Sequence, residues 1–483
     1  MKQTHRKRYS LRKRYSLKRA LAALLALASM ASLAACTAGN GGTTDTPGTP
    51  AADKKPGTVQ TLTSVQKPET AAKPNLDDYL KDGELDFDAY DQAYEAWHTD
   101  REMRLNQDDG WNDGMDAFYL ATAGEYLSGA GTENRVYSPL NVYLALAMLA
   151  ECTGGESRQQ ILDLLGAQSI EGLRKKASAL WESTYCDDGL TTSILASSLW
   201  LNQDVSFDQQ TLDTLAQAYY ASAFQGEMGS DAMNDALHDW LNEQTGGLLK
   251  DAADGVNLRP ETVIALAATL YFRASWSEKF YEGATADETF HAPSGDTVCS
   301  FLHSDDKGDY YWGDKFEATR LRFEDGGAMW LLLPREGYTT DDLLMDAQTQ
   351  QFLTSGGDWE QQSDVRLKLA LPKFDVSADF DLIDGLRALG VEDVFDASAS
   401  DFSPLVGEKM QNLAVSEATH AARVKIDEEG CEASAFTVEM VAESAEMAQE
   451  EIIELTFDRP FLFVVTAENE QPLFMGVVNQ PVE

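Results

Sequence analysis

The residues that most often carry catalysis are few in this chain of 483 residues. Apart from His5, the histidines are far apart in the sequence, at His98, His238, His291, His303 and His420. A hydrolase needs a nucleophile, a base and an orienting acid, and no GxSxG, HExxH, P-loop or GxGxxG pattern accompanies these histidines. The cysteines are widely spaced without a CxxC pair, which disfavours a zinc site or a dense disulfide framework. We therefore expect no enzyme activity, no metal and no other cofactor.

A segment near the C-terminus has a sequence that is compatible with two conformations. With a period of two, Cys431, Ala433, Ala435 and Thr437 form a row of small side chains that a β-sheet can bury without crowding. The same segment follows a charged Asp-Glu-Glu-Gly turn and precedes an acidic stretch without a strand pattern. From the residues alone it is either a strand or an exposed loop.

The elements around this segment predict an α+β fold, with helices before and between antiparallel strands. Ser138 as N-cap and Pro139 as first helical residue predict a buried helix through Cys152. The apolar run 262–272 predicts a central strand. Further helical patterns lie at 115–120, 233–241 and 379–389, and further strands at 321–323, 328–333, 365–371, 462–466 and 473–478.

A series of motifs, taken in order, resembles the serpins, a family of protease inhibitors. The resemblance covers residues 111–483. It rests on Tyr137-Ser138-Pro139-Leu140-Asn141, Leu241-Asn242-Glu243-Gln244-Thr245-Gly246-Gly247, Leu270-Tyr271-Phe272-Arg273-Ala274-Ser275-Trp276, Leu371-Pro372-Lys373-Phe374, Leu389-Gly390-Val391, Asp401-Phe402-Ser403, His420 with Ile426-Asp427-Glu428-Glu429-Gly430, Phe457-Asp458-Arg459-Pro460-Phe461 and Phe474-Met475-Gly476.

The resemblance implies one domain of three β-sheets and about nine helices, with an exposed reactive loop above a metastable body. In inhibitory members, a serine or cysteine protease cleaves the loop and is retained as the acyl-enzyme. The freed hinge of the loop then inserts as a new strand into the main sheet. The driving force is backbone hydrogen bonding and burial that the native state withholds.

The implied hinge is the two-conformation segment: Glu428, Glu429, Gly430, Cys431, Glu432, Ala433, Ser434, Ala435, Phe436 and Thr437. In the family's register the inward row is the small one, Cys431 to Thr437. Phe436 departs from the usual alanines but lies on the outward row. Glu439 would next point inward, where a lone carboxylate is costly to bury.

The resemblance also implies four residues that control opening of the sheet: Ser138, Asn141, His420 and Trp276. His420 matches a histidine beneath the main sheet, and Trp276 matches the tryptophan where the hinge first enters. The asparagine that usually completes the cluster is replaced by Ala268, so the hydrogen-bond network must differ.

The scissile bond is left open between two positions. Counting from the hinge gives Ser444-Ala445, whereas counting back from Phe457 gives a bond near Gln449. The candidate region is Ala442, Glu443, Ser444, Ala445, Glu446, Met447, Ala448 and Gln449. No Lys or Arg lies between Lys425 and Arg459, which disfavours a trypsin-like target. Small and apolar residues favour an elastase-like or subtilisin-like protease, and Glu443 or Glu446 leaves an acid-specific protease open.

The N-terminus has the pattern of a secretion signal over residues 1–35. Residues 1–19 carry nine Lys or Arg and no acid, and a short Ala/Leu-rich run follows. Leu33-Ala34-Ala35-Cys36 resembles a bacterial lipoprotein box, in which Cys36 becomes the acylated first residue; the alternative is an ordinary cleavage site with a chance cysteine. Residues 36–75 then predict a flexible Gly/Thr/Pro tether.

Residues 76–110 form an acidic extension before the main domain. Tyr90, Tyr94 and Trp97 have i, i+4, i+7 spacing, which predicts a short amphipathic helix that packs on the body. The alternative is a binding surface for a basic target.

The net charge of the chain argues against nucleic acid as a partner. Removal of the nine positive charges in residues 1–35 takes the formal net charge from −42 to −51, and such a chain is repelled by nucleic acid. We expect a monomeric bacterial lipoprotein that is anchored at the cell surface through Cys36. We expect it to inhibit an extracellular serine protease or, as the second option, a cysteine protease. The alternative is a surface lipoprotein of the same fold that acts in binding or adhesion without inhibition.

Overall fold

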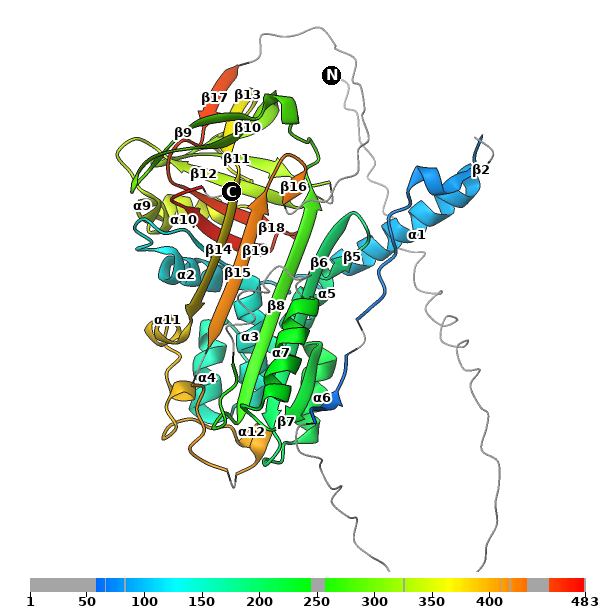
Figure 1. The fold of residues 1–483 in the computed structure, drawn as a ribbon, viewed down its shortest axis with the longest axis vertical. Helices are drawn as coiled ribbons and strands as arrows, with labels where there is room; N and C mark the ends of the chain where they lie inside the picture. Colours follow the sequence, from blue (N-terminus) through cyan, green and yellow to red (C-terminus); the bar gives the residue numbers. More distant parts are fainter. Residues whose placement is uncertain are drawn as a thin grey trace, which may run out of the picture. The chain divides into compact units, whose positions relative to one another are not determined.

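A computed structural model describes residues 58–65, 67–81, 84–244, 257–324, 326–408, 410–416, 418–431 and 451–481. These residues form three sheets, of eight, nine and two strands, with eleven α-helices (Figure 1). The predicted α+β class is therefore confirmed. None of the helices within these segments is both long enough and apolar enough to span a membrane.

The eight-stranded sheet contains the strand predicted from the apolar run 262–272. That strand is β8 (Ile264–Ser275), and it pairs antiparallel with β6 along eleven residues. The sheet order is β1 (Gln60–Thr63), β7 (Ala221–Gly226), β6 (Thr191–Asn202), β8, β16 (Gly430–Cys431), β15 (Thr419–Ile426) and β14 (Phe374–Asp381), with β5 (Cys186–Asp187) beside β6.

The nine-stranded sheet has two parts because β10 (Gly295–Trp312) is long enough to serve both. Residues 295–301 of β10 pair with β9, residues 301–311 pair with β13, and residues 310–312 pair with β11. The sheet order is β17 (Ile452–Thr456), β13 (Gln362–Pro372), β10, β11 (Phe316–Arg322), β12 (Ala328–Pro334), β18 (Phe461–Thr466), β19 (Pro472–Val478) and β4 (Arg135–Tyr137), with β9 (Ala286–Ala292) beside β10. The strands predicted at 321–323 and 328–333 lie in β11 and β12, which pair antiparallel.

Helix α3 (Pro139–Cys152) is the central helix that the sequence predicts. The Ser138 hydroxyl accepts a hydrogen bond from the Asn141 N–H at 3.2 Å, which caps the helix, and every residue of α3 except Ala145 is buried. The other α-helices are α1 (Phe87–Leu105), α2 (Met115–Leu127), α4 (Gly155–Leu164), α5 (Ile170–Thr184), α6 (Gln209–Ala218), α7 (Asp231–Gln244), α9 (Thr340–Leu344), α10 (Ala347–Leu353), α11 (Ile383–Ala388) and α12 (Ser403–Val406). Single 3₁₀ turns are η1 (Leu76–Tyr79), η2 (Glu282–Ala284) and η3 (Asp393–Phe395).

The eight-stranded sheet, called the main sheet from here on, is covered on both faces. Leu266 and Ala268 of β8 pack against the large core that contains α3, whereas the alternate residues Ala265 and Ala267 pack against the cluster of Met233 and Leu237 on α7. Because side chains alternate along a strand, α3 and α7 lie on opposite faces of β8. The first nine residues of β8 are apolar except Thr269 for this reason.

Two sequence predictions are wrong in part. The helix expected over 379–389 covers only α11, because the alternation of β14 continues to Asp381, whose carboxylate then accepts the Ile383 N–H at 2.8 Å. The tether expected over 36–75 does not extend that far: Gln60–Thr63 form β1, which pairs with β7. The apolar and β-branched run from Val59 to Val65 is the signal for this strand.

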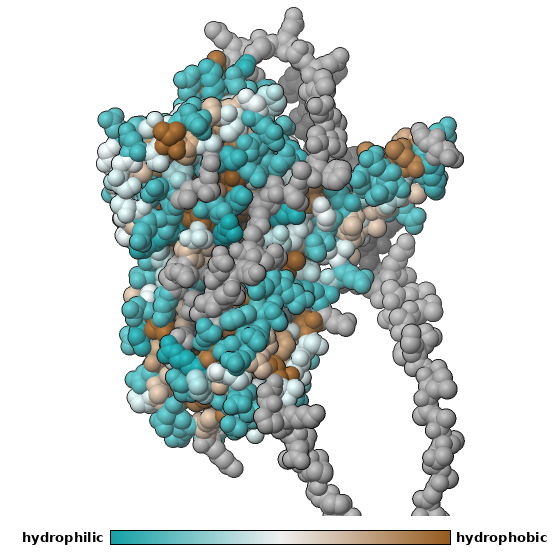
Figure 2. Space-filling model, viewed as in Figure 1, coloured by the Kyte–Doolittle hydropathy of each residue, from teal (hydrophilic) through white to brown (hydrophobic). Residues whose placement is uncertain are grey.

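The acidic extension contains the predicted helix, longer than expected. Tyr90, Tyr94 and Trp97 lie on α1, where their rings form a ladder with centroids 6.2 and 5.4 Å apart, and Trp97 is buried. Before α1, β2 (Leu80–Lys81) and β3 (Glu84–Leu85) form the two-stranded sheet. Exposed apolar side chains gather at this β2 end, at Leu76, Leu80 and Phe87 (Figure 2).

Candidate functional site

The predicted hinge begins where two neighbouring strands of the main sheet are only partly joined. Strands β8 and β15 are linked through the two residues of β16: Gly430 pairs with Ser275, and Cys431 pairs with Ala274 and Ile426. In the described part of the chain, no ladder joins β8 to β15 directly (Figure 1). We call the stretch over which β8 and β15 run side by side below β16 without a connecting ladder the slot. On β8 it comprises the six residues from Ala268 to Arg273, the first of which is level with His420 on β15.

The upper end of the slot is a tight turn over residues 427–430. The Asp427 carboxylate accepts the backbone N–H groups of Glu429 at 2.9 Å and Gly430 at 3.3 Å. A Cβ atom on Gly430 would lie 2.2 Å from the carbonyl oxygen of Ala274, so only glycine lets the chain approach β8 this closely. Cys431, the next residue, is 3% exposed and points into the core.

Trp276 anchors this turn to the end of β8. Its ring is buried, stacks on Phe323 at a centroid distance of 4.9 Å, and donates from Nε1 to the Asp427 carbonyl at 2.9 Å. Its backbone N–H donates to the Glu429 carbonyl at 2.9 Å. The predicted site residue Trp276 therefore lies against the first residues of the hinge.

Two lysines bind the carboxylates of the turn. Lys373 lies 3.0 Å from Glu428, which also accepts the Thr285 hydroxyl at 2.8 Å, and Lys279 lies 2.6 Å from Glu429. Burial by itself would raise the pKa of Glu428, but the hydrogen bonds from Thr285 and Lys373 outweigh it and hold that pKa below its ordinary value. Glu428 is therefore ionised at neutral pH.

The lower end of the slot is a neutral, buried cluster. The Ser138 backbone N–H donates to Nε2 of His420 at 3.0 Å, and Ser138 caps α3. Burial lowers the pKa of His420 to about 4, so its ring is uncharged at neutral pH and can act as an acceptor. Ser138 and His420, far apart in the sequence, are therefore in direct contact.

Asn141 brings an amide to position 268, where the resemblance implies an asparagine and this chain has alanine. From α3, its side-chain amide donates to the carbonyl oxygen of Ala268 on β8 at 2.9 Å. The amide thus comes from the helix and reaches the strand, instead of coming from the strand. This contact ties β8 to α3 at the same level as His420.

The two clusters mark the two ends of the slot. On β15, His420 and Ile426 are six residues apart, and on β8, Ala268 and Ala274 are also six residues apart. Six residues of strand span about 20 Å. The hinge residues Glu432 to Thr437, the candidate scissile region Ala442 to Gln449, and Cys36 lie outside the described residues.

Several residues of the site were not expected from the sequence. Lys279, Lys373 and Thr285 bind the turn from segments that are far from it in the chain, and no local signal marks them. The Asp427-to-Gly430 turn does carry a signal, since aspartate followed by glycine three residues later is typical of a turn in which the aspartate accepts backbone N–H groups. In the described residues, no group of three or more acidic, histidine or cysteine side chains could hold a metal ion.

The family model described as "Serpin (serine protease inhibitor)" matches residues 114–481. The chain belongs to the serpin family. A serpin-like protein of Thermococcus kodakarensis is 29% identical over 368 residues, which cover 74% of this chain and 83% of that protein. Plasminogen activator inhibitor 1 of Bos taurus is 30% identical over 370 residues, covering 72% and 87%.

Solved serpin structures have the same fold. The thermophilic serpin tengpin in its native state matches with a TM-score of 0.69 and 22% identity, covering 78% of this chain and 95% of tengpin. Arabidopsis AtSerpin1 in its native stressed conformation matches with a TM-score of 0.68 and 25% identity, covering 78% and 100%. The predicted family is confirmed, and serpins as a family are inhibitors that bind target proteases.

Proposed function

We propose that this serpin traps its target as a suicide substrate: the protease cleaves the reactive loop, the acyl-enzyme is retained, and the hinge inserts into the slot as a new strand. The observation that carries this proposal is the slot itself. Residues Gly430 and Cys431 already pair with β8 and β15 at its upper end, and no strand lies between β8 and β15 below them in the described residues.

The slot supplies the free energy for insertion. Below Ala274, β8 pairs with β6 on one side, and Ala267 and Ala268, at the level where β15 begins, are only half-buried. An inserted strand would add backbone hydrogen bonds on the other side and bury these apolar side chains. Both terms favour the inserted state once cleavage frees the hinge.

The start of the hinge supports the predicted register. Cys431 is buried between β8 and β15, so a strand that continues from it would place Ala433, Ala435 and Thr437 inward and Phe436 outward. The inward side chains are all small. Glu439 is the next inward residue, and insertion past it would require the carboxylate to lie near solvent.

The target that fits the loop is an extracellular elastase-like or subtilisin-like serine protease. The stretch between Lys425 and Arg459 lacks the basic side chain that a trypsin-like specificity pocket requires. We further propose that residues 1–35 direct secretion and that a lipid on Cys36 holds the protein at the surface of a bacterial cell.

Incubation with pancreatic elastase or subtilisin tests the mechanism. We expect a protease-linked band that resists SDS and a fall in protease activity that follows the band. A clipped product with full protease activity would contradict trapping and would favour the alternative, a serpin-fold surface lipoprotein that acts only as a substrate or in binding or adhesion.

Ala435→Pro tests strand insertion directly. Proline removes a backbone N–H and constrains the chain, so the variant should be cleaved without forming the linked complex. Ala435→Ser is the matched control, because it keeps the N–H and a small side chain and should still trap the protease. A linked complex from Ala435→Pro in normal yield would show that the hinge does not insert as described.

A further inference from the structure

The residues before the serpin domain are attached to the side of the main sheet that β7, β6 and β5 form. Strand β1 adds to the edge strand β7, with Gln60 opposite Gln225 and Thr61 opposite Phe224. Beyond it, the Thr70 hydroxyl donates to the Asp187 carbonyl at 2.6 Å, and the Lys73 N–H donates to the Asp188 carbonyl at 2.7 Å. The chain therefore follows the side of the sheet formed by β7, β6 and β5 up to its end.

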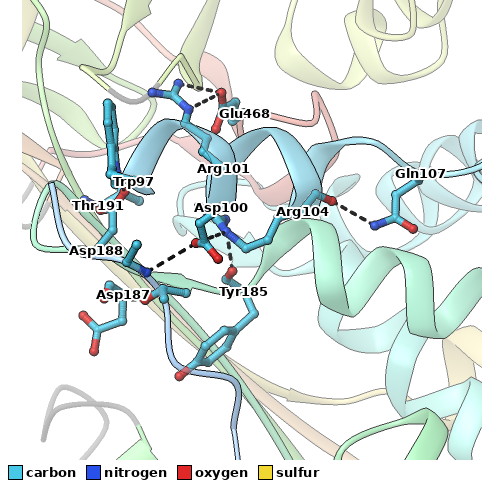
Figure 3. Close-up of polar contacts among 12 residues, drawn as sticks. Trp97, Asp100, Arg101, Arg104, Gln107, Tyr185, Asp187, Asp188, Thr191 and Glu468 are labelled. Carbon is cyan, nitrogen blue, oxygen red and sulfur yellow. Dashed lines mark hydrogen bonds and ion pairs between the residues drawn. The ribbon is translucent and has the colours of Figure 1, made fainter. Parts of the chain in front are cut away.

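Helix α1 then binds the same end of the sheet through its second half (Figure 3). Trp97, 4% exposed, donates from Nε1 to the Asp188 carboxylate at 2.8 Å. The Arg104 guanidinium donates to the Tyr185 carbonyl at 3.2 Å. Arg101 covers the Trp97 ring, with its guanidinium 5.3 Å from the ring centroid, and lies 2.5 Å from Glu468.

Asp188 connects this helix with the residues of the hinge. Asp188 is buried, and its carboxylate accepts the N–H of Thr191 at 2.9 Å as well as the Trp97 N–H. Thr191 begins β6 and pairs with Ala274 of β8, which pairs in turn with Cys431. Trp97 therefore contacts, through Asp188, the start of β6, which is level with Ala274 and with Cys431 at the beginning of the hinge.

Glu468 is connected through β19 and β4 to strands on the other side of the slot. It lies in the turn between β18 and β19, and β19 pairs with β4, which packs against both β14 and β15. An inserted strand must separate β8 from β15. Contacts of α1 with Asp188 and with Glu468 therefore connect the start of β6 to a turn whose strand β19 leads through β4 to β14 and β15. Asn469 makes a second link, since it donates to Ser183 at 2.8 Å and Thr184 at 3.0 Å.

We infer that residues 58–110 form a strap that restrains opening of the slot and so slows insertion of the hinge. This inference rests on the proposed trapping mechanism, because it assigns a regulator to the same strand insertion. The strap keeps the intact serpin from inserting its own uncleaved loop. Contacts that exist before the slot opens and are lost as it opens raise the barrier to opening by the free energy they contribute.

Variants of the full mature chain test the strap. Trp97→Phe keeps the ring but removes the hydrogen bond to the buried carboxylate, and Arg101→Gln removes the ion pair with Glu468. We expect the intact protein to convert to a heat-resistant, non-inhibitory form roughly tenfold faster in Trp97→Phe and roughly threefold faster in Arg101→Gln. Met103→Gln is the control, because this side chain on the same helix is 65% exposed and should leave the rate unchanged.

The second measurement is the melting temperature after loop cleavage, which separates the strap from the mechanism beneath it. If cleaved wild type gains heat resistance and both variants convert as slowly as Met103→Gln, the strap is wrong and trapping stands. If cleavage gives wild type no added heat resistance, insertion does not occur and both proposals fail. Should Trp97→Phe fail to fold, Arg101→Gln decides by itself, because its side chain lies at the surface of the docked helix, 21% exposed.

Discussion

The two ends of the slot are held by different kinds of interaction. At the upper end, two partly exposed ion pairs, Lys373 with Glu428 and Lys279 with Glu429, hold a turn against β8. At the lower end, uncharged and buried groups form hydrogen bonds: the His420 ring accepts from the Ser138 N–H, and the Asn141 amide donates to the Ala268 carbonyl. Ion pairs near solvent are weakened by salt, whereas buried hydrogen bonds are not. In the proposed mechanism, the hinge begins to insert at the end held by salt-sensitive ion pairs and has to break buried hydrogen bonds to go further.

Acid should weaken the lower end more than any other change considered. Because the pKa of His420 is lowered to about 4 in the fold, against 6.5 in the unfolded chain, the unfolded chain binds more protons between these values. The free energy of unfolding should be full above pH 6.5 and fall by roughly 3 kcal/mol as the pH drops to 4. Urea denaturation at pH 7 and pH 4 measures this loss.

His420→Gln should remove most of that acid dependence, since glutamine does not titrate. His291→Gln is the control, because His291 is exposed beside Asp296 and lies away from the slot. Equal losses between pH 7 and pH 4 in wild type and His420→Gln would assign the acid effect to other groups.

A side chain at Gly430 should disrupt the upper end sterically. Gly430→Ala places a methyl group against the backbone of Ala274, and we expect a loss of about 2 kcal/mol in the free energy of unfolding. Gly124→Ala is the matched control: its Cβ would lie 3.7 Å from Met345 within helix α2, which is ordinary contact, so stability should be unchanged or slightly higher. Thermal melting of both variants compares them, and equal melting temperatures would show that the turn can shift freely.

The position of the amide, on Asn141 of α3 and not on residue 268 of β8, can be tested by moving the amide to the strand. Asn141→Ala should lower the free energy of unfolding by about 1.5 kcal/mol, because the Ala268 carbonyl loses its donor. Adding Ala268→Asn restores an amide from the strand side and should recover part of the loss. A double-mutant cycle in urea measures the coupling, and strictly additive effects would mean that the two positions do not share one contact.

The smallest effect is expected from the ion pairs of the upper end. Lys373→Gln should cost no more than about 1 kcal/mol at low salt and still less at 0.5 M NaCl. Lys368→Gln is the control, since Lys368 pairs with the exposed Glu454 on β17, away from the turn. If the loss in the free energy of unfolding for Lys373→Gln did not depend on salt, the ion pair of Lys373 with Glu428 would be shielded from solvent, and the two ends of the slot would not differ in this way.

Local signals predicted the elements that carry the site. Ser138 and Pro139 predicted the start of α3, because a side-chain cap and a fixed backbone angle act within four residues. The almost wholly apolar run 262–272 predicted β8, because a strand covered on both faces needs no alternation. The end of β14 was missed, because a helix pattern and a strand pattern overlap at Asp379 and only the pairing with β15 decides between them.

Within the candidate site, the row of small side chains that starts at Cys431 and the glycine before it follow from the sequence alone, because alternation along a strand and the lack of a Cβ are properties of the chain itself. The tertiary structure decided the rest. It brought Lys373 to Glu428, Asn141 to Ala268 and Trp97 to Asp188, pairs that lie 55, 127 and 91 residues apart. Contacts at such separations depend on how whole elements pack, and no local pattern encodes which partner will be adjacent.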